Sequence, residues 1–372
     1  MGKFTDRIIL ILNGVFAAAL LISYFSPIIN PSKFVMVALF GLAYPYLLVL
    51  NLVFVCYWLV RLKKEIILSF ILILAGWNHL NNLLPLNFRN HDLGSREASP
   101  GIFKVMSYNV RGFDLYDWTH DPDTKRKILN FIELQDPDII CFQEFYTSPR
   151  KGETLAEISG QLQRYPESAV YYTADRTNRN GFGIATYSRF PIIKRSRIPF
   201  NSPSNAAMYT DMLIHQDTIR IFNVHLQSIR FQKDQYAFMD TVRLMYSSDQ
   251  LKEIRSIGSR LKIAFTLRSE QASMIAGYIS ESPYPVVVMG DFNDTPQSYA
   301  YREVLKGMHD AFRKAGRGFG NTYSGEMPSF RIDYILYSDP LVPYQFERIK
   351  TDLSDHFPIT SWFSFSETVS AE

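Results

Sequence analysis

The stretch PVVVMGDFNDTP, residues 285–296, decides how the rest of the chain is interpreted. Its apolar, β-branched run at residues 286–289 is typical of a buried strand, which stops at the glycine that follows. Asp291 and Asn293 come at the end of that strand, and the alternation of side chains along a strand turns Phe292 to the opposite side. Two interpretations fit this stretch alone: a solvated turn with an Asx motif, or part of an active site.

The composition divides the chain of 372 residues into two parts. Continuous apolar sequence is concentrated before residue 90, whereas charged and turn residues dominate after it. The net charge of +3 is too small to indicate a nucleic-acid-binding protein. The two cysteines, Cys56 and Cys141, lie in apolar runs and are predicted to be buried small hydrophobic residues rather than a disulfide.

Three apolar segments predict three transmembrane helices, at about residues 8–25, 34–60 and 66–86. The first also fits a signal peptide, but the two apolar segments that follow favour a helix. The second is long enough to cross a bilayer even with a bend at Pro45. The third is interrupted by polar residues, among them His79, which either lines a functional cavity or lies at the interface at a helix end.

Basic residues flank these segments unequally and predict the orientation of the chain. They gather before the first segment and after the second, at Lys3, Arg7, Arg61, Lys63 and Lys64. Such residues favour the cytoplasm, so three crossings of an inner membrane would place everything after residue 90 on the periplasmic or extracellular side. If the third segment only dips into the membrane, that part would be cytoplasmic. The predicted organisation is a membrane anchor at 1–86, a linker at 87–100 and one α/β catalytic domain at 101–372.

Polar and often ionisable residues follow strand after strand in the second part of the chain. They are Asn109, Glu144, Asn223 with His225, Asp291 with Asn293, Asp333, and Asp355 with His356. Because the ends of neighbouring strands converge in space, these side chains are predicted to line one pocket. Carboxylates and amides without cysteine suit Mg²⁺ or Mn²⁺ better than zinc, and histidines beside them suit a phosphate.

An ordered series of short motifs carries these residues. The motifs are SYNVRG at 107–112, QE at 143–144, NVHLQ at 223–227, GDFND at 290–294, RIDYIL at 331–336 and SDHFPI at 354–359. Together they resemble the endonuclease/exonuclease/phosphatase (DNase I-like) superfamily, which includes DNase I, repair nucleases, neutral sphingomyelinases and inositol polyphosphate 5-phosphatases. The resemblance covers residues 101 to about 365 and implies a four-layered αββα sandwich, here with a membrane anchor in front of it.

The resemblance also implies which residues bind metal. Glu144 would be the main metal ligand, with Asn109 close by, and Asp355 would serve a second metal position or its water shell. Asn223 is assigned to substrate binding, with a purely structural hydrogen-bonding role as the alternative.

The remaining motif residues are implied to act on the phosphate. Asp291 would orient or deprotonate the attacking water, and Asn293 would hold a phosphate oxygen. His356, oriented by Asp333, would stabilise or protonate the transferring phosphoryl group, and His225 would contact another phosphate oxygen. The implied reaction is in-line attack of water at phosphorus, helped by one or two Mg²⁺ or Mn²⁺ ions.

The substrate is inferred from the anchor, because no basic patch interleaved with aromatic residues indicates nucleic acid. An anchor holds the site beside a bilayer and raises the local concentration of a lipid. The preferred hypothesis is a membrane-anchored phosphoesterase acting on a phospholipid, a sphingolipid or a polyprenyl pyrophosphate. The alternatives are an extracellular or periplasmic Mg²⁺-dependent nuclease, and a sensor that binds phospholipid headgroups without turnover.

Two further segments have open roles. Residues 229–267 carry basic and apolar side chains and form either a lid on anionic headgroups or an ordinary amphipathic helix packed on the sheet. The polar residues of 175–180 form either a substrate-contacting loop or a solvated turn. The headgroup, the type of phosphate bond, the number of metal ions and the oligomeric state stay open at this point.

Overall fold

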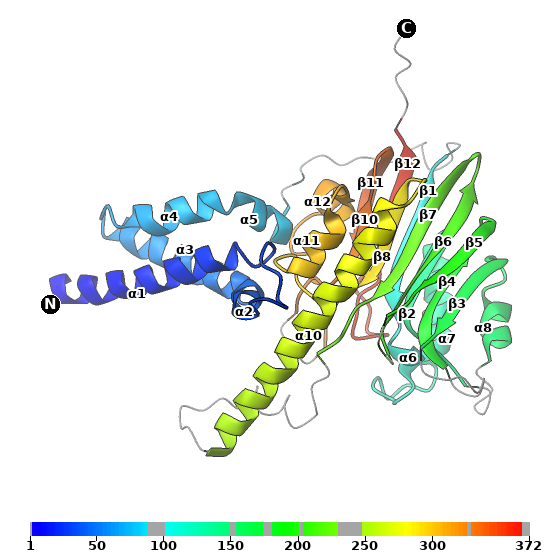
Figure 1. Cartoon of the computed structure of the whole chain (residues 1–372), viewed down its shortest axis with the longest axis horizontal. Coiled ribbons are helices and arrows are strands. Elements are labelled where there is room, and N and C mark those ends of the chain that lie inside the picture. The colour runs from blue at the N-terminus through cyan, green and yellow to red at the C-terminus, as the bar shows by residue number, and fades with distance from the viewer. Residues whose placement is uncertain are drawn as a thin grey trace, which may run out of the picture.

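Two six-stranded sheets form the centre of the domain that follows the apolar helices (Figure 1). The first sheet runs in the order β11 (Leu341–Arg348), β12 (Ile359–Phe365), β1 (Phe103–Asn109), β2 (Ile139–Thr147), β4 (Gly181–Ser188) and β3 (Glu167–Tyr172). The second runs in the order β5 (Ile192–Ile198), β6 (Ala206–Ile214), β7 (Asp217–His225), β8 (Val286–Asp291), β10 (Asp333–Tyr337) and β9 (His309–Asp310). The pairs β1 with β2 and β7 with β8 are parallel, and the other pairs are antiparallel.

The structure is a computed structural model that describes most of the chain. The described residues are 2–85, 87, 101–148, 154–173, 181–200, 202, 204–229, 248–325 and 329–366. The predicted linker lies outside the described residues apart from Asn87, and so do the whole polar segment 175–180 and residues 230–247 of the predicted insert.

The sheets pack face to face because side chains alternate along each strand. Val287 and Met289 of β8 join the core between the two sheets, whereas Val286 and Val288 point to the outer face of the second sheet. This confirms the buried strand predicted for residues 286–289. Cys141 lies in the core between the sheets, as predicted, but Cys56 is exposed on the apolar helices, so the prediction that both cysteines are buried is wrong.

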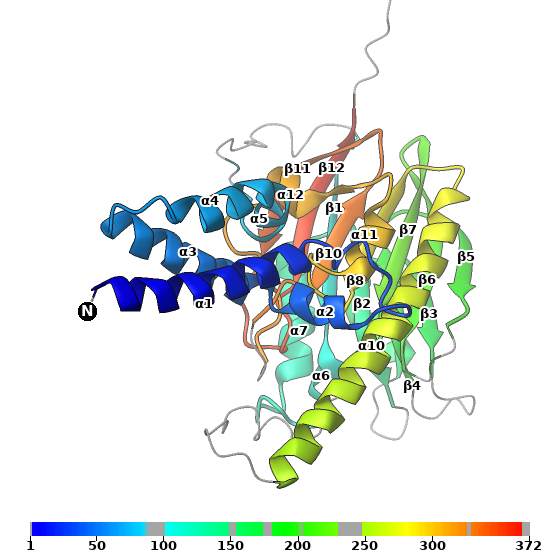
Figure 2. The ribbon, with the colours of Figure 1, turned by 60° about the vertical axis from the view of Figure 1, so that its left-hand side comes forward.

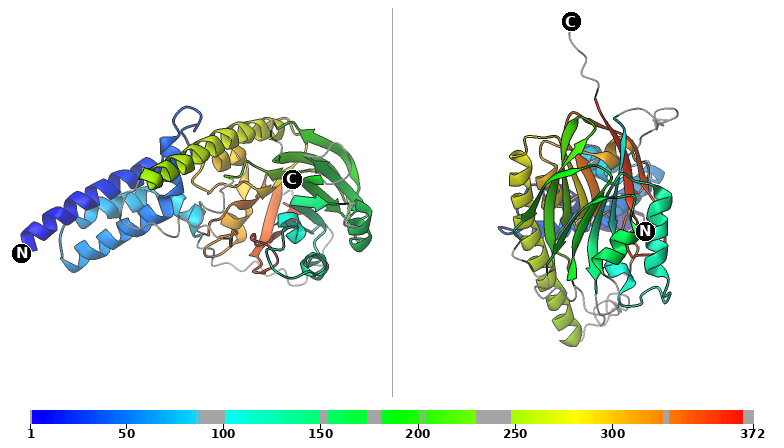
Figure 3. Two further views of the ribbon diagram at one scale, coloured as in Figure 1. Left: turned by 90° about the horizontal axis from the view of Figure 1, so that it is seen from below. Right: turned by 90° about the vertical axis from the view of Figure 1, so that its right-hand side faces the viewer.

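Helices cover the outer faces of both sheets. The outer face of the first sheet packs against α7 (Thr124–Gln135) and α8 (Leu155–Gln161). The outer face of the second packs against α10 (Ser248–Ser280) and α11 (Tyr299–Leu305), and short helices α6 (Arg111–Asp114) and α12 (Ala311–Ala315) lie in connections. The four layers are visible in Figure 3 (right) and confirm the predicted αββα sandwich.

The predicted insert is described from residue 248 onward as the single helix α10. Ala272 and Ile275, in its second half, pack on the second sheet. Its first turns extend beyond the sheets (Figures 1 and 2). Residues 248–267 of the insert are therefore helical, whereas Ala272 and Ile275, which pack on the sheet, belong to the part of α10 that follows the insert.

The apolar region forms a bundle of α1 (Gly2–Ser23), α2 (Met36–Leu42), α3 (Tyr44–Val60), α4 (Ile66–Ala75) and α5 (Trp77–Leu83). Only α1, with a mean hydropathy of 1.8, is by itself long and apolar enough to span a membrane among the described residues. The pair α2 and α3 is bent by 64° and the pair α4 and α5 by 68°, so the bundle has up to three spans if each bent pair counts as one. The prediction of three clear transmembrane helices is corrected accordingly.

The bend in the second segment has a local cause. Pro45 lies in the first turn of α3, where its missing N–H and fixed φ suit the start of a new helix and not the continuation of α2. The bend expected at Pro45 is therefore present.

Buried polar side chains hold the bundle together. Ser69 Oγ donates to Asn51 Oδ1 at 2.7 Å and accepts from Asn13 Nδ2 at 2.5 Å, and Trp58 Nε1 donates to Asn13 Oδ1 at 2.9 Å. All four side chains are at most 1% exposed. This network joins α1, α3 and α4 and gives each of these buried polar groups a partner.

Candidate active site

Asp291 lies at the centre of the predicted site and is 1% exposed. Its Oδ2 accepts a hydrogen bond from Asn109 Nδ2 at 3.0 Å, and its Oδ1 accepts one from the backbone N–H of Asn293 at 2.7 Å. Nε2 of His225 and Nε2 of His356 each lie 3.8 Å from Asp291 Oδ2. The structure thus brings residues from β1, β7, β8 and the segment before β12 to one point, as the motif spacing predicted.

The register of three adjacent strands produces this convergence. His225 of β7 pairs with Asp291 of β8, which in turn pairs with Asp333 of β10. Strands β7 and β8 approach closely at Gly290, which has a φ of 149° and where an added Cβ would lie 1.9 Å from the Val224 carbonyl oxygen. Only glycine fits there, so Gly290 allows β7 and β8 to approach closely enough to bring His225 beside Asp291.

His356 and Asp333 form a buried pair beside Asp291. His356 Nδ1 lies 2.9 Å from Asp333 Oδ2, and the backbone N–H of Asp333 donates to Thr322 Oγ1 at 3.1 Å. Burial alone would lower the pKa of His356, but the Asp333 and Asp291 carboxylates outweigh it and raise this pKa well above its usual value. Nδ1 of His356 thus faces Asp333, and its Nε2 faces Asp291.

Glu144 reaches the site from a bulge within β2. The pairing of β2 with β4 shifts register between Phe142 and Phe145, and Glu144 has a φ of 51°. A strand end was predicted here, but β2 continues to Thr147, so that prediction is wrong. The bulge turns the Glu144 carboxylate toward the site.

The environment of Glu144 is acidic and partly open. Its side chain is 36% exposed, and its Oε1 lies 3.4 Å from Asn109 Nδ2 and 3.7 Å from His225 Nε2. Desolvation, and to a smaller extent the Asp355 carboxylate, raise the pKa of Glu144. A carboxylate whose charge is disfavoured by burial and by a neighbouring carboxylate is a suitable place for a cation.

Asp355 forms part of the wall of a polar cavity of about 290 Å³ beside this cluster. Its Oδ2 pairs with Arg111 Nε at 3.2 Å, and the Arg111 guanidinium lies 4.0 Å from the centre of the Trp118 ring. Asp114, Ser324 and Asp352 also line this cavity. Asp355 is thus close to Glu144 but already has a positive partner.

Asn223 is not placed to bind a substrate. It is fully buried, and its Nδ2 donates to the backbone oxygens of Phe142 and Ala185 at 3.2 and 2.9 Å. Its Oδ1 accepts from Gln143 Nε2 at 2.8 Å. The predicted substrate-binding role is corrected: the amide of Asn223 ties the two sheets together, which is the structural alternative.

Asn293 lies in a strained turn that a distant arginine supports. Its φ is 52°, and its Nδ2 donates to Leu226 O at 3.0 Å and to Asp291 Oδ2 at 3.2 Å. The guanidinium of Arg268, which is 1% exposed, donates to the Asn293 carbonyl oxygen and lies 3.2 Å from Asp294 Oδ2. Sequence reasoning missed Arg268, because α10 carries many basic residues and nothing local distinguishes this one.

The donor set of the cluster suits a hard divalent cation. Glu144, Asp291 and Asp355 offer carboxylate oxygens, and oxygen ligands are those that Mg²⁺ and Mn²⁺ prefer. Atoms of Asp291, Asp333 and His356 also lie within 4.8 Å of one another. Since Asp333 and His356 hydrogen-bond to each other, the side of the cluster that contains Glu144 is the better place for a metal ion.

Comparison with known proteins agrees with this geometry. The sequence model of the Endonuclease/Exonuclease/phosphatase family matches residues 106–356. The chain belongs to this family and is a hydrolase of phosphoester bonds, a class whose members typically use a divalent metal. A second sequence model, described as a domain of unknown function, matches residues 6–83, the helical bundle.

Solved structures share the fold of the second part of the chain. Endonuclease/exonuclease/phosphatase proteins from Bacteroides vulgatus and Bacteroides thetaiotaomicron both have a TM-score of 0.53, at 16% and 17% identity. They cover 71% and 72% of this chain, and 99% of each of their own chains is covered.

A curated relative, the CCR4-Not complex 3'-5'-exoribonuclease subunit Ccr4 of Mycosarcoma maydis, is 22% identical over 314 residues. The match covers 66% of this chain and 46% of the relative, so this chain spans less than half of that protein's length.

Proposed function

We propose that this protein is a membrane-anchored phosphoesterase that hydrolyses a phosphate ester or anhydride of a membrane lipid by metal-assisted attack of water. The observation that carries the proposal is that the anchor binds the loops next to the catalytic residues. His79 Nδ1 of α5 lies 2.6 Å from Gln297 Oε1, and Gln297 Nε2 donates to the His79 carbonyl oxygen at 3.0 Å. Arg331 Nη2 donates to the Asn82 carbonyl oxygen at 3.1 Å.

These contacts involve both loops that carry the chemistry. Gln297 follows Asp291 and Asn293 in one loop, and Arg331 lies two residues before Asp333, the first residue of β10. The anchor therefore holds the site at a fixed place relative to the bilayer surface. A lipid headgroup is the phosphate-containing substrate that this arrangement supplies at high local concentration.

In the proposed mechanism Asp291 accepts a proton from the attacking water. Burial raises the pKa of Asp291 to about 7, although the positive charge of His356 acts in the opposite direction. A carboxylate whose pKa lies near neutrality is a suitable general base. As the new oxygen–phosphorus bond forms, the water proton moves to Asp291, and the leaving oxygen, in line with the attacking water, departs with the electron pair of the broken bond and takes up a proton from water.

The histidines and Asn293 are assigned to the phosphoryl oxygens. Nε2 of His356, held by Asp333, donates a hydrogen bond where negative charge builds up, and His225 contacts a second oxygen. Asn293 contacts a third oxygen by exchanging its present hydrogen bond to Asp291 for one to the phosphate. The position of both Nε2 atoms at 3.8 Å from Asp291 Oδ2 supports a phosphate bound between these side chains.

We assign the metal ion, Mg²⁺ or Mn²⁺, to Glu144 with Asn109, and a second position or its water shell to Asp355. A bound divalent cation would polarise the phosphoryl oxygens and neutralise developing charge. Asn109 also donates to Asp291, so it couples the metal position to the general base.

The proposed location is the inner membrane, with residues 1–86 as a multi-pass anchor, 87–100 as a linker and 101–372 as the catalytic domain on the periplasmic or extracellular side. Basic residues support this orientation: Arg61 pairs with Asp6 at 3.1 Å, at the end of the bundle that lies away from the sheets (Figure 1). Cleavage of residues 90–100 by added protease tests it, in cells whose outer membrane has been permeabilised and whose inner membrane is intact. Protection that is lost only on lysis would place the domain in the cytoplasm.

A nuclease acting outside the cytoplasm is the second candidate function. The observation that favours it is the curated relative, which is named an exoribonuclease. The two candidates use the same cluster and differ in the substrate that reaches it.

The discriminating experiment offers the purified full chain, with Mg²⁺, plasmid DNA, RNA, phosphatidic acid, sphingomyelin and a polyprenyl pyrophosphate. We expect turnover of a lipid phosphate with the nucleic acids left intact, and no turnover by Asp291→Asn. Rapid cleavage of DNA or RNA with inert lipids would overturn the proposal in favour of the nuclease. Lipid binding without turnover of any substrate would indicate a sensor.

A further inference from the structure

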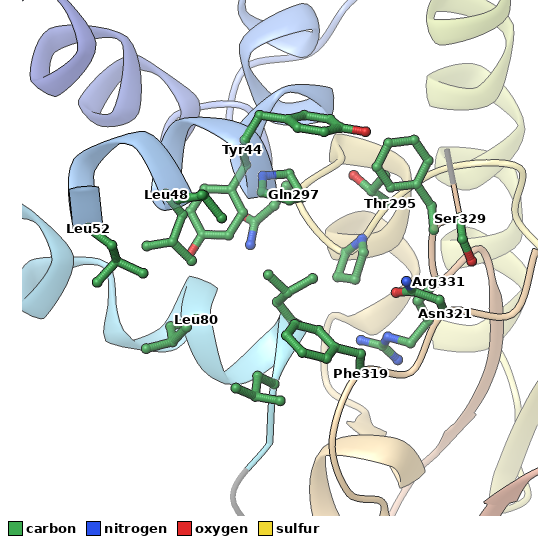
Figure 4. A pocket seen from close by; sticks show the side chains of 17 residues that line it. Tyr44, Leu48, Leu52, Leu80, Thr295, Gln297, Phe319, Asn321, Ser329 and Arg331 are labelled. Atoms are coloured by element: carbon green, nitrogen blue, oxygen red, sulfur yellow. The ribbon is translucent and has the colours of Figure 1, made fainter. Parts of the chain in front are cut away.

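A cavity of about 320 Å³ lies between the anchor and the catalytic domain. Leu48 and Leu52 of α3 and Leu80 of α5 form one side, and Thr295 and Arg331 form the other (Figure 4). Phe319 lies between the two sides (Figure 4). The volume of the cavity falls within the range of about 300–1,000 Å³ that is usual for ligand pockets.

The lining offers little to a charged ligand. The guanidinium of Arg331 pairs with Asp310 Oδ2 at 2.7 Å and is 4.7 Å from the Phe312 ring, so its charge is already matched. Both ends of the Gln297 amide are bonded to His79. The cavity therefore suits a hydrocarbon group and not a phosphate.

The cavity is continuous with the surface that would face lipid. Leu52 is 44% exposed although it lines the cavity, and its neighbour Val53 on the same helix is 57% exposed. Phe319, on the catalytic side, is 61% exposed. An apolar chain from the bilayer thus has a direct route between α3 and the loop that carries Phe319.

The cavity also adjoins the catalytic loops. Thr295 lies in the loop that begins with Asp291 and Asn293, and Arg331 lies just before Asp333. The backbone N–H of Phe292 donates to the Ile332 carbonyl oxygen at 2.8 Å and joins the two loops. A chain in the cavity would therefore have its polar end near the phosphate site.

We propose that this cavity binds one hydrocarbon chain of a membrane lipid and thereby positions the phosphate of that lipid toward Asp291. The inference rests on the proposed function. Because lipid tails are about as apolar as leucine, moving a chain from the bilayer into the cavity gains little hydrophobic free energy. The cavity therefore contributes orientation of the substrate and not affinity, which is a way to lower the barrier of the reaction.

The test is photo-cross-linking with phosphatidic acid that carries a diazirine at the end of one palmitoyl chain. The full chain is reconstituted in vesicles of phosphatidylethanolamine and phosphatidylglycerol, in the Asp291→Asn background so that turnover does not interfere. Leu52→Trp fills the cavity, and Val53→Trp is the matched control, which adds the same side chain to the outer surface of the same helix. Thermal unfolding of the two variants is compared to show that both remain folded.

We expect cross-links at Leu48 and Phe319, reduced about tenfold or more by Leu52→Trp because overpacking excludes the chain, and retained in Val53→Trp. Cross-links confined to the outer surface of the bundle, or reduced equally by both variants, would overturn the inference. Lipid turnover by the parent protein without cavity cross-links would overturn it and leave the proposed function standing. If the parent turns over no lipid phosphate, the proposed function fails, whatever the cross-links are.

Discussion

The anchor and the catalytic domain place polar and apolar side chains in opposite ways. Most of the exposed large hydrophobic side chains lie in residues 4–77, where Asn13, Asn51 and Ser69 are fully buried. In the described part of residues 101–366, buried apolar side chains fill the layers between sheets and helices, and several polar side chains gather at Asp291. The helical bundle thus exposes apolar side chains and buries polar ones, the reverse of the catalytic domain, and the catalytic loops contact the bundle.

The largest expected effect is on kcat, and it follows the loss of the proposed general base, Asp291, in the catalytic domain. Asp291→Asn keeps the shape of the side chain but removes the proton acceptor, so we expect kcat to fall by about 10²–10⁴-fold. The measurement is steady-state turnover of the lipid phosphate identified in the substrate panel. Glu281→Gln, an exposed charge-removing control, should keep full activity, and activity that survives in Asp291→Asn would remove Asp291 from the mechanism.

The next effect concerns the metal. Chelation with EDTA should abolish turnover, and added Mg²⁺ or Mn²⁺ should restore it. Glu144→Gln weakens the proposed metal site, so the Mg²⁺ concentration for half-maximal activity should rise by about tenfold or more. An unchanged Mg²⁺ dependence in Glu144→Gln would place the metal elsewhere, for example at Asp291, Asp333 and His356.

A smaller effect tests the corrected role of Asn223. Asn223→Ala leaves buried partners such as the Gln143 amide unsatisfied, so the free energy of unfolding should fall by about 1–3 kcal/mol. Because Asn223 does not contact the substrate, KM should stay unchanged at a temperature where the variant is folded. Asn130→Ala, at an exposed position of α7, is the control. A raised KM with unchanged stability would restore the substrate-binding role.

The smallest expected effect is on the stability of the helical bundle. Ser69→Ala removes the hydroxyl that bridges Asn13 and Asn51, and polar contacts between membrane helices contribute about 0.6–2 kcal/mol. Thermal unfolding in detergent should show a small loss of stability, with turnover of a soluble phosphate ester unchanged. Ser259→Ala, at an exposed position of α10, should change neither quantity.

Much of the catalytic domain could be predicted from the sequence, because its signals are local. The side chains of residues 286–289 point alternately into two hydrophobic cores. The ordered motifs contain Asp291, His225 and His356, which lie next to one another in the structure. Strand ends that converge are a consequence of the sheet alone, so no long-range information was needed.

The parts that could not be predicted depend on contacts between distant segments. The bulge that aims Glu144 arises from the pairing of β2 with β4, and the motif letters do not encode it. Arg268 supports Asn293 from a helix whose sequence has many basic residues. Asn223 resembles a site residue in its motif, and only the packing of the two sheets shows that its amide is occupied.

The apolar helices were predicted in position but not in shape. Hydropathy identifies apolar segments, but whether each is one straight helix depends on how Pro45 and the neighbouring helices fit together. The hydrogen bonds that the catalytic loops form with His79 and with the Asn82 carbonyl oxygen have no sequence signal. They are the contacts that connect the two regions.

The most direct test of the central claim, that the anchor holds the site against lipid of its own membrane, is a vesicle-mixing assay. The lipid phosphate substrate is placed either in the vesicles that contain the full chain or only in vesicles that lack it, and its hydrolysis is followed with Mg²⁺ present. We expect hydrolysis of substrate in the protein's own vesicles and almost none in the other population. Equal hydrolysis in both populations would contradict the account.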